Sequence, residues 1–288
     1  MTDKKVVWCQ PPKTGVFDRN AGVKRRMSGM LSSDKPTRDM PINKISAVEI
    51  FQNQLRLEIE KKPNMLLLCK FEQPEKAAEY LRRIVQRNKQ SLRTLSIDQI
   101  GFPIETLNIS ELRDLKSFIL DTHRDRLVAF TDLRQFYKIS ENVTLANITI
   151  NVDQLLQFQA AKIIIDDALI SSRDLNAYLK VFEIGHFPDE TEELMIFTDR
   201  RCPLDFDQVV KNRSCIGKRD ELDNTSFALL STKMERIAVV EIQQHSFKMR
   251  IYSRQQFEFE EELFQRFGND IEEEYLQRDY VFVDLVIV

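Results

Sequence analysis

The chain has 288 residues, of which 42% are hydrophobic, and its formal net charge at pH 7 is −3. This length and composition suffice for a large core in one or two domains. The small net charge gives the whole molecule no strong attraction to nucleic acid or to an anionic membrane. The 7 glycines are few for this length, which disfavours glycine-rich phosphate-binding loops.

Targeting signals and cysteine usage indicate the cellular compartment of the protein. Met1 is followed by the polar run Thr2-Asp3-Lys4-Lys5, and no apolar segment of signal-peptide type comes after it. No stretch approaches 18 consecutive apolar residues, so we expect no membrane span and no membrane partner. The cysteines are scattered, without a C-x-x-C pair or a nearby histidine, as in proteins of a reducing compartment. We therefore expect an intracellular protein, cytoplasmic or nuclear.

Residues 1–44 differ from the rest of the chain. Prolines, glycines and serines interrupt any hydrophobic period, and basic residues outnumber acidic ones, most densely at Lys24-Arg25-Arg26. Such a composition predicts a basic, largely disordered arm. The arm supports one alternative function, association with nucleic acid. That alternative is disfavoured because no helix-turn-helix, zinc finger or aromatic RNA-binding signature accompanies the arm.

The segment after the arm predicts both helices and strands. Apolar residues at helical spacing predict a helix over 46–60, which Pro63 would end. Residues 65–71 have the pattern of a strand. A second helix is predicted after Pro74, because proline suits the first turn and an apolar stripe follows it.

Five β-prone segments then recur along the chain, over 92–97, 115–120, 143–150, 162–165 and 193–197. Helices are predicted between several of them, over 132–139, 152–158, 172–184 and 206–211. A strand–helix unit of this size cannot bury its apolar face alone, whereas stacked units share a continuous core. We therefore predict an α/β fold, a leucine-rich-repeat-like strand–helix solenoid. An ordinary mixed α/β domain is the alternative.

The last part of the chain changes character. Residues 237–242 and 247–252 have the pattern of two strands, and the four residues between them suit a hairpin. An acidic segment with interleaved phenylalanines follows and predicts an amphipathic helix. Residues 280–288 form a β-prone run that we expect to pair inside the sheet. The chain thus divides into a basic arm (1–44), a repeat-like domain (45–252), and an acidic amphipathic segment with a terminal strand (253–288).

The search for catalytic chemistry is negative. No dinucleotide-binding, Walker A, zinc-protease or nucleophile-elbow motif occurs. His123 lies in an aspartate-flanked polar stretch, and Asp166-Asp167 could ligate a metal. A solvated histidine and helix-capping acids explain these residues more simply. We predict no catalytic, cofactor-binding or metal-binding residues and no enzyme activity; a hydrolase that uses His123 or Asp166 is the competing hypothesis.

One stretch of the chain carries a family resemblance. It combines Leu155-Leu156, a strand over 161–166 and a polar-then-apolar segment over 171–180. The motif residues that match are Asp174, Leu175, Asn176, Leu179, Lys180 and Gly185. Tyr178 stands where phenylalanine is usual, and Phe182 stands near the usual tryptophan. This pattern resembles the F-box-associated domain (type 2) of nematode F-box proteins over 143–212, and the hairpin at 237–252 resembles that family's terminal hairpin.

The resemblance implies a protein-interaction module, like the part of an SCF-type ubiquitin ligase that captures the protein substrate. A Skp-type adaptor and a cullin are the further partners that it implies, and it implies no cofactor. The chain has no recognisable F-box, because 1–44 is too polar and 46–60 supplies one helix only. A ligase-independent binding protein is therefore the alternative.

The candidate residues divide into two groups. Exposed polar positions could contact a partner, namely Arg93, Lys116, Arg200 and Arg201. The motif residues favour structural roles. Asp174 would accept hydrogen bonds from free backbone N–H groups at a helix start, and Asn176 would satisfy backbone groups in a neighbouring turn.

Overall fold

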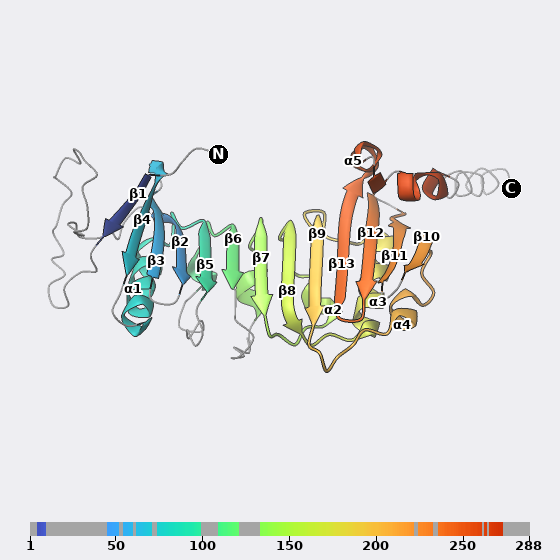
Figure 1. The fold of residues 1–288 in the computed structure, drawn as a ribbon, viewed down its shortest axis with the longest axis horizontal. Helices are drawn as coiled ribbons and strands as arrows, with labels where there is room; N and C mark the ends of the chain where they lie inside the picture. Colours follow the sequence, from blue (N-terminus) through green and yellow to red (C-terminus); the bar gives the residue numbers. More distant parts are fainter. Residues whose placement is uncertain are drawn as a thin grey trace. The chain divides into compact units, whose positions relative to one another are not determined.

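The architecture comes from a computed structural model of the chain. It describes residues 5–9, 45–51, 54–59, 62–70, 74–98, 109–120, 133–221, 224–232, 236–260, 262–263 and 265–272. The chain forms two compact units, Met1–Leu115 and Lys116–Val288, and each has strands with helices packed against them (Figure 1). Within the predicted arm, Lys5–Cys9 form β1, and residues 10–44 lie outside the described residues.

The described strands of the first unit follow the order β1-β4-β3-β2-β5. Their bounds are β1 (Lys5–Cys9), β2 (Ile45–Phe51), β3 (Gln54–Ile59), β4 (Lys62–Lys70) and β5 (Thr94–Asp98). The three central strands β4, β3 and β2 are antiparallel, whereas β1 joins β4 and β5 joins β2 in parallel. The strand predicted over 65–71 is confirmed as β4, and the one over 92–97 as β5.

Helix α1 (Pro74–Arg87) packs against β2 and β3. It buries the predicted apolar stripe, Ala77, Tyr80, Leu81, Ile84 and Val85. Asn88 ties the end of α1 to the start of β2, because its side chain donates to the Ile84 carbonyl (2.7 Å) and accepts from the Ile45 amide (3.0 Å). The helix predicted after Pro74 is confirmed.

The helix predicted over 46–60 is wrong, because this stretch forms the antiparallel strands β2 and β3. The helical spacing rested on Val48, Phe51, Leu55 and Ile59. Apolar residues also occur with the period of two that strands require, and Val48, Ile50, Leu55 and Leu57 are all buried. Pairing with β4 and β5 satisfies the backbone groups of both strands, and this long-range pairing outweighs the local helical pattern.

The described strands of the second unit follow the order β6-β7-β8-β9-β13-β12-β11-β10. Their bounds are β6 (Ser117–Leu120), β7 (Asn142–Ala146), β8 (Lys162–Ala168), β9 (Glu193–Thr198), β10 (Ile216–Glu221), β11 (Asn224–Leu230), β12 (Arg236–Gln243) and β13 (Ser246–Ser253). The first four are parallel to one another, and β9 then pairs antiparallel with β13, which begins an antiparallel run to β10. The predicted hairpin of β12 and β13 is confirmed.

The predicted leucine-rich-repeat-like solenoid is wrong, because a mixed sheet with few helices dominates the described residues. The parallel run ends at β9, whose other neighbour is the antiparallel β13. Two of the helices predicted between strands are only single turns: the 3₁₀ turn η3 (Leu133–Phe136) within 132–139 and the four-residue α2 (Val152–Leu155) within 152–158. A further 3₁₀ turn, η2 (Ile109–Glu111), was not predicted. A regular spacing of β-prone segments therefore predicted strands but not how they pair.

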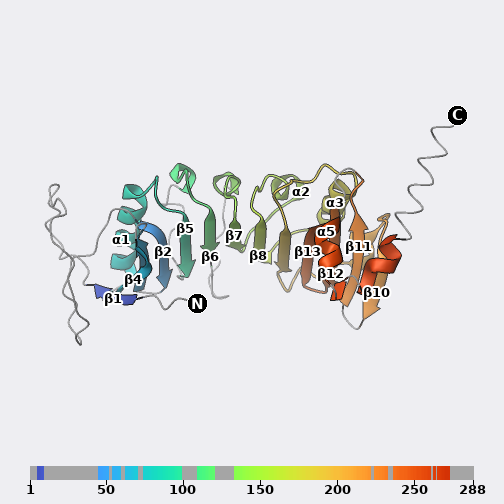
Figure 2. The same cartoon turned by 90° about the horizontal axis from the view of Figure 1, so that it is seen from above.

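One face of the second unit forms its main core. A row of buried side chains crosses the sheet in register, made of Phe118, Val143, Ile163, Leu194 and Met249. Phe118 stacks on Phe136 of η3, with ring centroids 4.9 Å apart. Helix α3 (Ser172–Glu183), with the short α4 (Phe206–Val210) beside it, buries Leu175, Tyr178, Leu179 and Phe182. Figure 2 shows α2 and α3 on this side of the second unit.

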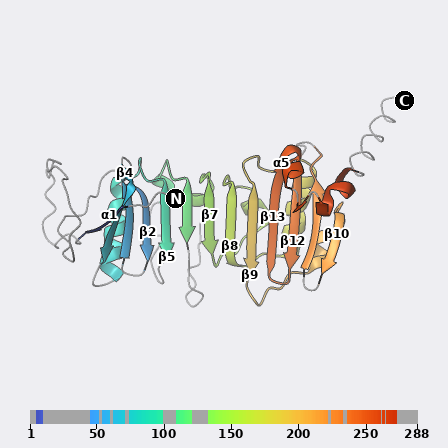
Figure 3. The ribbon, with the colours of Figure 1, turned by 45° about the horizontal axis from the view of Figure 1, so that its top comes forward.

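The acidic segment after β13 packs on the opposite face, over β10, β11 and β12 and against Tyr252 of β13 (Figures 2 and 3). It contains α5 (Arg254–Phe259) and further helical residues over 265–272. Its apolar side chains Phe257, Phe267 and Ile271 are buried against five sheet residues, Ile216, Ala228, Leu230, Ile237 and Val239. The predicted amphipathic helix is therefore present, and residues 273–288, with the predicted terminal strand, lie outside the described residues.

Among the described residues, no helix combines the length and the apolar character needed to cross a membrane.

Candidate functional site

The motif residues of the sequence analysis lie in α3 and its two ends. Ser171 caps the helix, accepting from the Asp174 amide at 3.1 Å. The Asp174 carboxylate accepts from the Ser171 hydroxyl and from the Val152 amide (3.2 Å) at the start of α2. Asp174 thus joins the starts of two helices, because both have free backbone N–H groups there.

Asn176 lies half-buried on the next turn and reaches α4. Its side-chain amide donates to the carbonyl oxygens of Val209 (2.7 Å) and Lys211 (2.9 Å). These carbonyls belong to the end of α4, where intrahelical partners are missing. The side chains of Asp174 and Asn176 thus both form hydrogen bonds with backbone groups of the same unit.

The remaining motif residues shape the helix. Leu175 and Leu179 are fully buried in the core, while Lys180 is exposed in the last turn, where a cation offsets the helix dipole. Gly185 follows with φ of 71°, a left-handed conformation that favours glycine. Its N–H donates to the Phe182 carbonyl, and the next amide, of His186, donates to Val181, which ends α3 in a Schellman-type cap.

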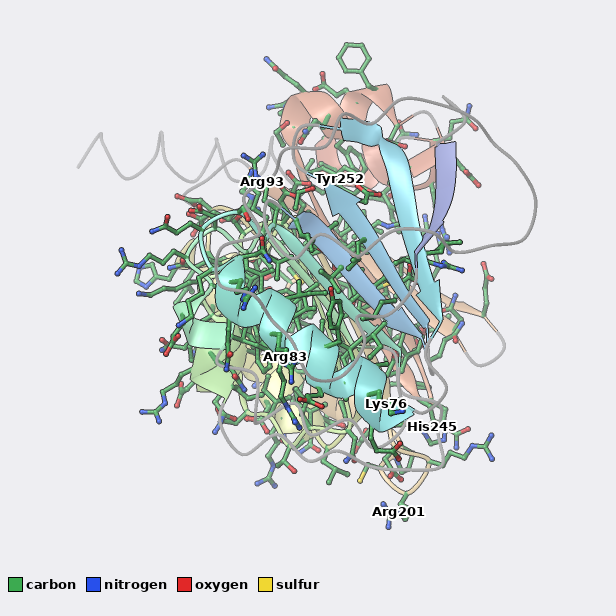
Figure 4. All side chains as sticks on the ribbon, turned by 90° about the vertical axis from the view of Figure 1, so that its left-hand side faces the viewer. Lys76, Arg83, Arg93, Arg201, His245 and Tyr252 are labelled. Atoms are coloured by element: carbon green, nitrogen blue, oxygen red, sulfur yellow. The ribbon has the colours of Figure 1, made fainter. Side chains whose placement is uncertain are left out.

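The exposed polar candidates belong to both units, and those of the second unit lie at opposite ends of its parallel strands. Arg93 precedes β5 in the first unit and is labelled in Figure 4. In the second unit, Lys116 pairs with Glu141 at 2.9 Å, and Arg200 is exposed in the turn after β9. Arg201 projects from the same turn (Figure 4) and pairs with Asp199.

Open α/β sheets commonly bind ligands at the ends of their parallel strands, and the polar residues described there in the second unit include Asp166, Asp167, Asp199 and His245. Asp199 accepts from Arg201 through the backbone N–H, Nε and Nη2, and these bonds hold the pKa of Asp199 well below its usual value. Asp166 and Asp167 lie at an irregularity of β8, where Asp167 has φ of 48°. His245 lies in the β12–β13 turn with Nδ1 3.4 Å from the Thr198 hydroxyl.

Metal binding finds no support in the described part of the chain, where no three His, Cys, Asp or Glu residues group to hold an ion. His123, the other half of the hydrolase hypothesis, lies outside the described residues. At the described strand ends, the Asp199 carboxylate is thus engaged by Arg201 within its own turn.

The surface that stands out is the face of the second-unit sheet opposite α3. Strand neighbours in register point to the same face, so the residues that alternate with the core row define it. We call it the open face; its residues are Ser117, Ile119, Asn142, Thr144, Lys162, Ile164, Glu193, Met195, Phe197, Lys248 and Arg250. Within the described part of the second unit, no helix lies over β6 to β9 on this side (Figures 1 and 3).

An ion-pair triad occupies one row of the open face. The Glu193 carboxylate receives Lys162 Nζ at 2.8 Å on one oxygen and Arg250 Nε at 3.0 Å on the other. Burial by itself raises the pKa of Glu193, but the hydrogen bonds and charges of the two cations together outweigh it, so the pKa is lowered. The carboxylate is recessed (side chain 17% exposed), whereas Lys162 (43%) and Arg250 (49%) protrude.

A largely apolar row runs beside the triad. It crosses four parallel strands as Ile119, Thr144, Ile164 and Met195, all half-buried, and reaches Lys248 on β13. Phe197, one step further along β9, is 44% exposed. Aliphatic and aromatic side chains between charges are typical of the surfaces that proteins use to bind one another.

The sequence indicated these strands but not this surface. The run Lys162-Ile163-Ile164-Ile165 is apolar on both sides of the strand, which suggests burial of both faces. Only the register of β8 with β9 shows that Ile163 faces the core and Ile164 the open face.

Comparison with known proteins adds no assignment: no family model, no curated protein and no solved structure matches this chain.

Proposed function

We propose that this chain is a protein-interaction module and that the open face is its binding surface. The observation that carries the proposal is the row Ile119, Thr144, Ile164 and Met195, with Phe197 beside it. Covering such a row removes apolar surface from water, at about 25 cal/mol per Å². The same face of the same sheet is already covered over β10 to β12, and at Tyr252 of β13, by apolar side chains of α5 and of residues 265–272.

A rigid frame supports a binding role. Each open-face side chain stands on a strand whose opposite side chains are in the core, such as Ile163, Leu194 and Met249. A surface held in this way loses little conformational entropy when a partner docks. The triad around Glu193 would set the partner's orientation more than its affinity, because charges at an interface mainly provide specificity.

The test compares partners recovered by affinity purification of the tagged full chain. Phe197→Ser and Met195→Glu change the open face. Ile184→Ser, a matched control, removes an equally exposed apolar side chain (42%) at the end of α3. We expect wild type and the control to retain the same proteins, and both open-face variants to lose them while their melting temperatures stay near that of wild type. Recovery of the same proteins by all variants would contradict the proposal.

We propose further that the captured partner is the substrate of an SCF-type ubiquitin ligase, which rests on the resemblance of the motif over 171–185. The same purification tests it. A Skp-type adaptor and a cullin should be recovered with wild type and also with Phe197→Ser, because the adaptor would bind elsewhere. Partners without these two subunits would leave a ligase-independent binding protein.

A further inference from the structure

The part of this face that is already covered indicates what kind of segment it accepts. Phe257 of α5, with Phe267 and Ile271 farther on, is buried on it. The contact also has polar anchors: Arg266 donates to the Ser226 hydroxyl at 2.7 Å, and Arg219 pairs with Asp270 at 3.1 Å. This face therefore accepts amphipathic helical segments.

The covered part continues into the open face without a break. In one row across the strands, Ala228 is in register with Val239, Val239 with Arg250, and Arg250 with Glu193. The first two lie under the helical segment, and the last two belong to the triad. Strands are spaced about 4.8 Å apart and packed helices about 10 Å apart. Helix α5 already packs on Tyr252 of β13, so a second helix beside the first would lie over β9, β8 and the remaining part of β13.

The charges on the open face indicate which kind of partner helix would bind there. Around the triad, the exposed side chains are the cations Lys162 and Arg250, whereas the Glu193 carboxylate between them is recessed. The other carboxylates of β8, β9 and β13, those of Asp166 and Asp167, lie at the far end of β8. Lys248 Nζ lies 4.0 Å from Glu241 on β12. The chain's own segment over 254–272 carries six carboxylates against two arginines. An acidic partner helix would thus complement the protruding cations. It would also resemble the chain's own acidic segment, which already packs on this face.

We infer that the open face docks an acidic amphipathic helix of a partner protein, next to the helical segment that the chain itself supplies. This inference rests on the proposed function and names the chemistry of the partner. Apolar side chains of the partner helix would pack on Ile164, Met195 and Phe197. Its carboxylates would reach the exposed guanidinium of Arg250 and the ammonium groups of Lys162 and Lys248.

Two designed peptides of about 18 residues, a length at which an isolated helix can form, test the inference. Both carry the same leucine stripe at positions i, i+3, i+4 and i+7, and the remaining positions hold mainly glutamate in one and mainly lysine in the other. Fluorescence anisotropy with the full chain measures binding of each. We expect the glutamate peptide to bind about tenfold more tightly or better, with the preference shrinking as salt rises.

Variants of the full chain locate the binding. Arg250→Gln should weaken the binding of the glutamate peptide about two- to fivefold and should not weaken the binding of the lysine peptide. Met195→Glu should weaken the binding of the glutamate peptide more strongly. If the Met195→Glu variant does not fold, Phe197→Ser serves in its place. Lys180→Gln is the matched control, because it removes an exposed cation on α3, on the opposite face.

The outcomes separate this inference from the proposed function. Equal or tighter binding of the lysine peptide overturns the acidic partner. If neither peptide binds, or if Met195→Glu and Phe197→Ser leave binding unaffected, the inference that the open face docks a helix is overturned. If partners are nevertheless lost with Phe197→Ser in the purification, the open face still binds proteins, but of another chemistry.

Discussion

Asn176 and Val209 are 33 positions apart in the chain, yet the side-chain amide of Asn176 on α3 lies 2.7 Å from the carbonyl oxygen of Val209 on α4. The same amide reaches the Lys211 carbonyl at 2.9 Å. One side chain therefore supplies the two donors that the end of α4 lacks, and it holds that short helix against α3.

Replacing Asn176 by alanine should lower the free energy of unfolding by about 1–3 kcal/mol, because two carbonyl oxygens lose their partners. Urea denaturation measures the change. Gln157→Ala, at an exposed position after α2, is the control and should alter stability by less than about 0.5 kcal/mol. Equal stability of the Asn176 variant and wild type would show that water replaces the amide without cost.

Gly217→Ala should loosen the helical residues over 265–272. Gly217 has φ of 58°, and an added Cβ would lie 2.5 Å from Asp270 Oδ2 and 2.9 Å from Phe267 Cδ1. Gly185→Ala shares the positive φ (71°) and serves as the control for backbone strain of about 1 kcal/mol. Hydrogen exchange over 265–272 should accelerate in the Gly217 variant alone. Equal protection in both variants would mean that the helix shifts to accommodate the methyl group.

The burial of Tyr178 predicts that the folded protein loses stability at alkaline pH. Its complete burial raises the pKa of the hydroxyl far above the ordinary value, and the charge of Arg236 opposes this only in part. The folded state therefore keeps the proton at a pH where the unfolded state releases it. Stability from this group is complete below the unfolded pKa of about 10 and falls by about 1.4 kcal/mol per pH unit above it.

Tyr178→Phe should remove that part of the pH dependence. Urea denaturation at about pH 8 and about pH 11 measures it, and the loss between the two should be smaller in the variant by about 1 kcal/mol. Tyr252→Phe, at a half-buried tyrosine whose pKa burial also raises, should show a smaller effect. An identical alkaline loss in the Tyr178 variant and wild type would contradict the prediction.

Cys215 should react slowly as a nucleophile. Partial burial, followed by the nearby Glu183 charge, raises the pKa of its thiol to about 11. At about pH 8 its thiolate fraction is then about 100-fold below that of an ordinary thiol, because each pKa unit changes the fraction tenfold. Alkylation by iodoacetamide, followed by peptide mass spectrometry, measures the rate against a small cysteine peptide in the same solution. The rate at Cys215 should still rise beyond about pH 10; a plateau near pH 9 would contradict the raised pKa.

Local patterns predicted much of the chain because they depend on near neighbours. The apolar stripe of α1, the cap Ser171 and the alternation in β13 each indicate their element without reference to the rest of the fold. The same logic failed over 46–60, where helical and strand periods were both present and the partners β4 and β5 decided the outcome.

The candidate site could not be predicted to the same extent. Asn176 was expected to satisfy backbone groups in a neighbouring turn, but the identity of that turn depends on where α4 packs. The triad of Lys162, Glu193 and Arg250 combines three strands that are distant in sequence. Nothing in the local sequence of Glu193 indicates two cationic neighbours.

The sequence by itself determined many of the elements: several strands where β-branched and aliphatic residues recur, α3 between its cap and Gly185, and an amphipathic acidic segment after β13. It did not predict β2 and β3 as strands, nor β10 and β11. Only the tertiary structure decided that β9 pairs antiparallel with β13 and that the acidic segment covers one end of a sheet face whose other end is open. The reason is physical. Propensity and periodicity act within a few residues, whereas strand order and exposure are fixed by hydrogen bonds and burial between segments far apart in the chain.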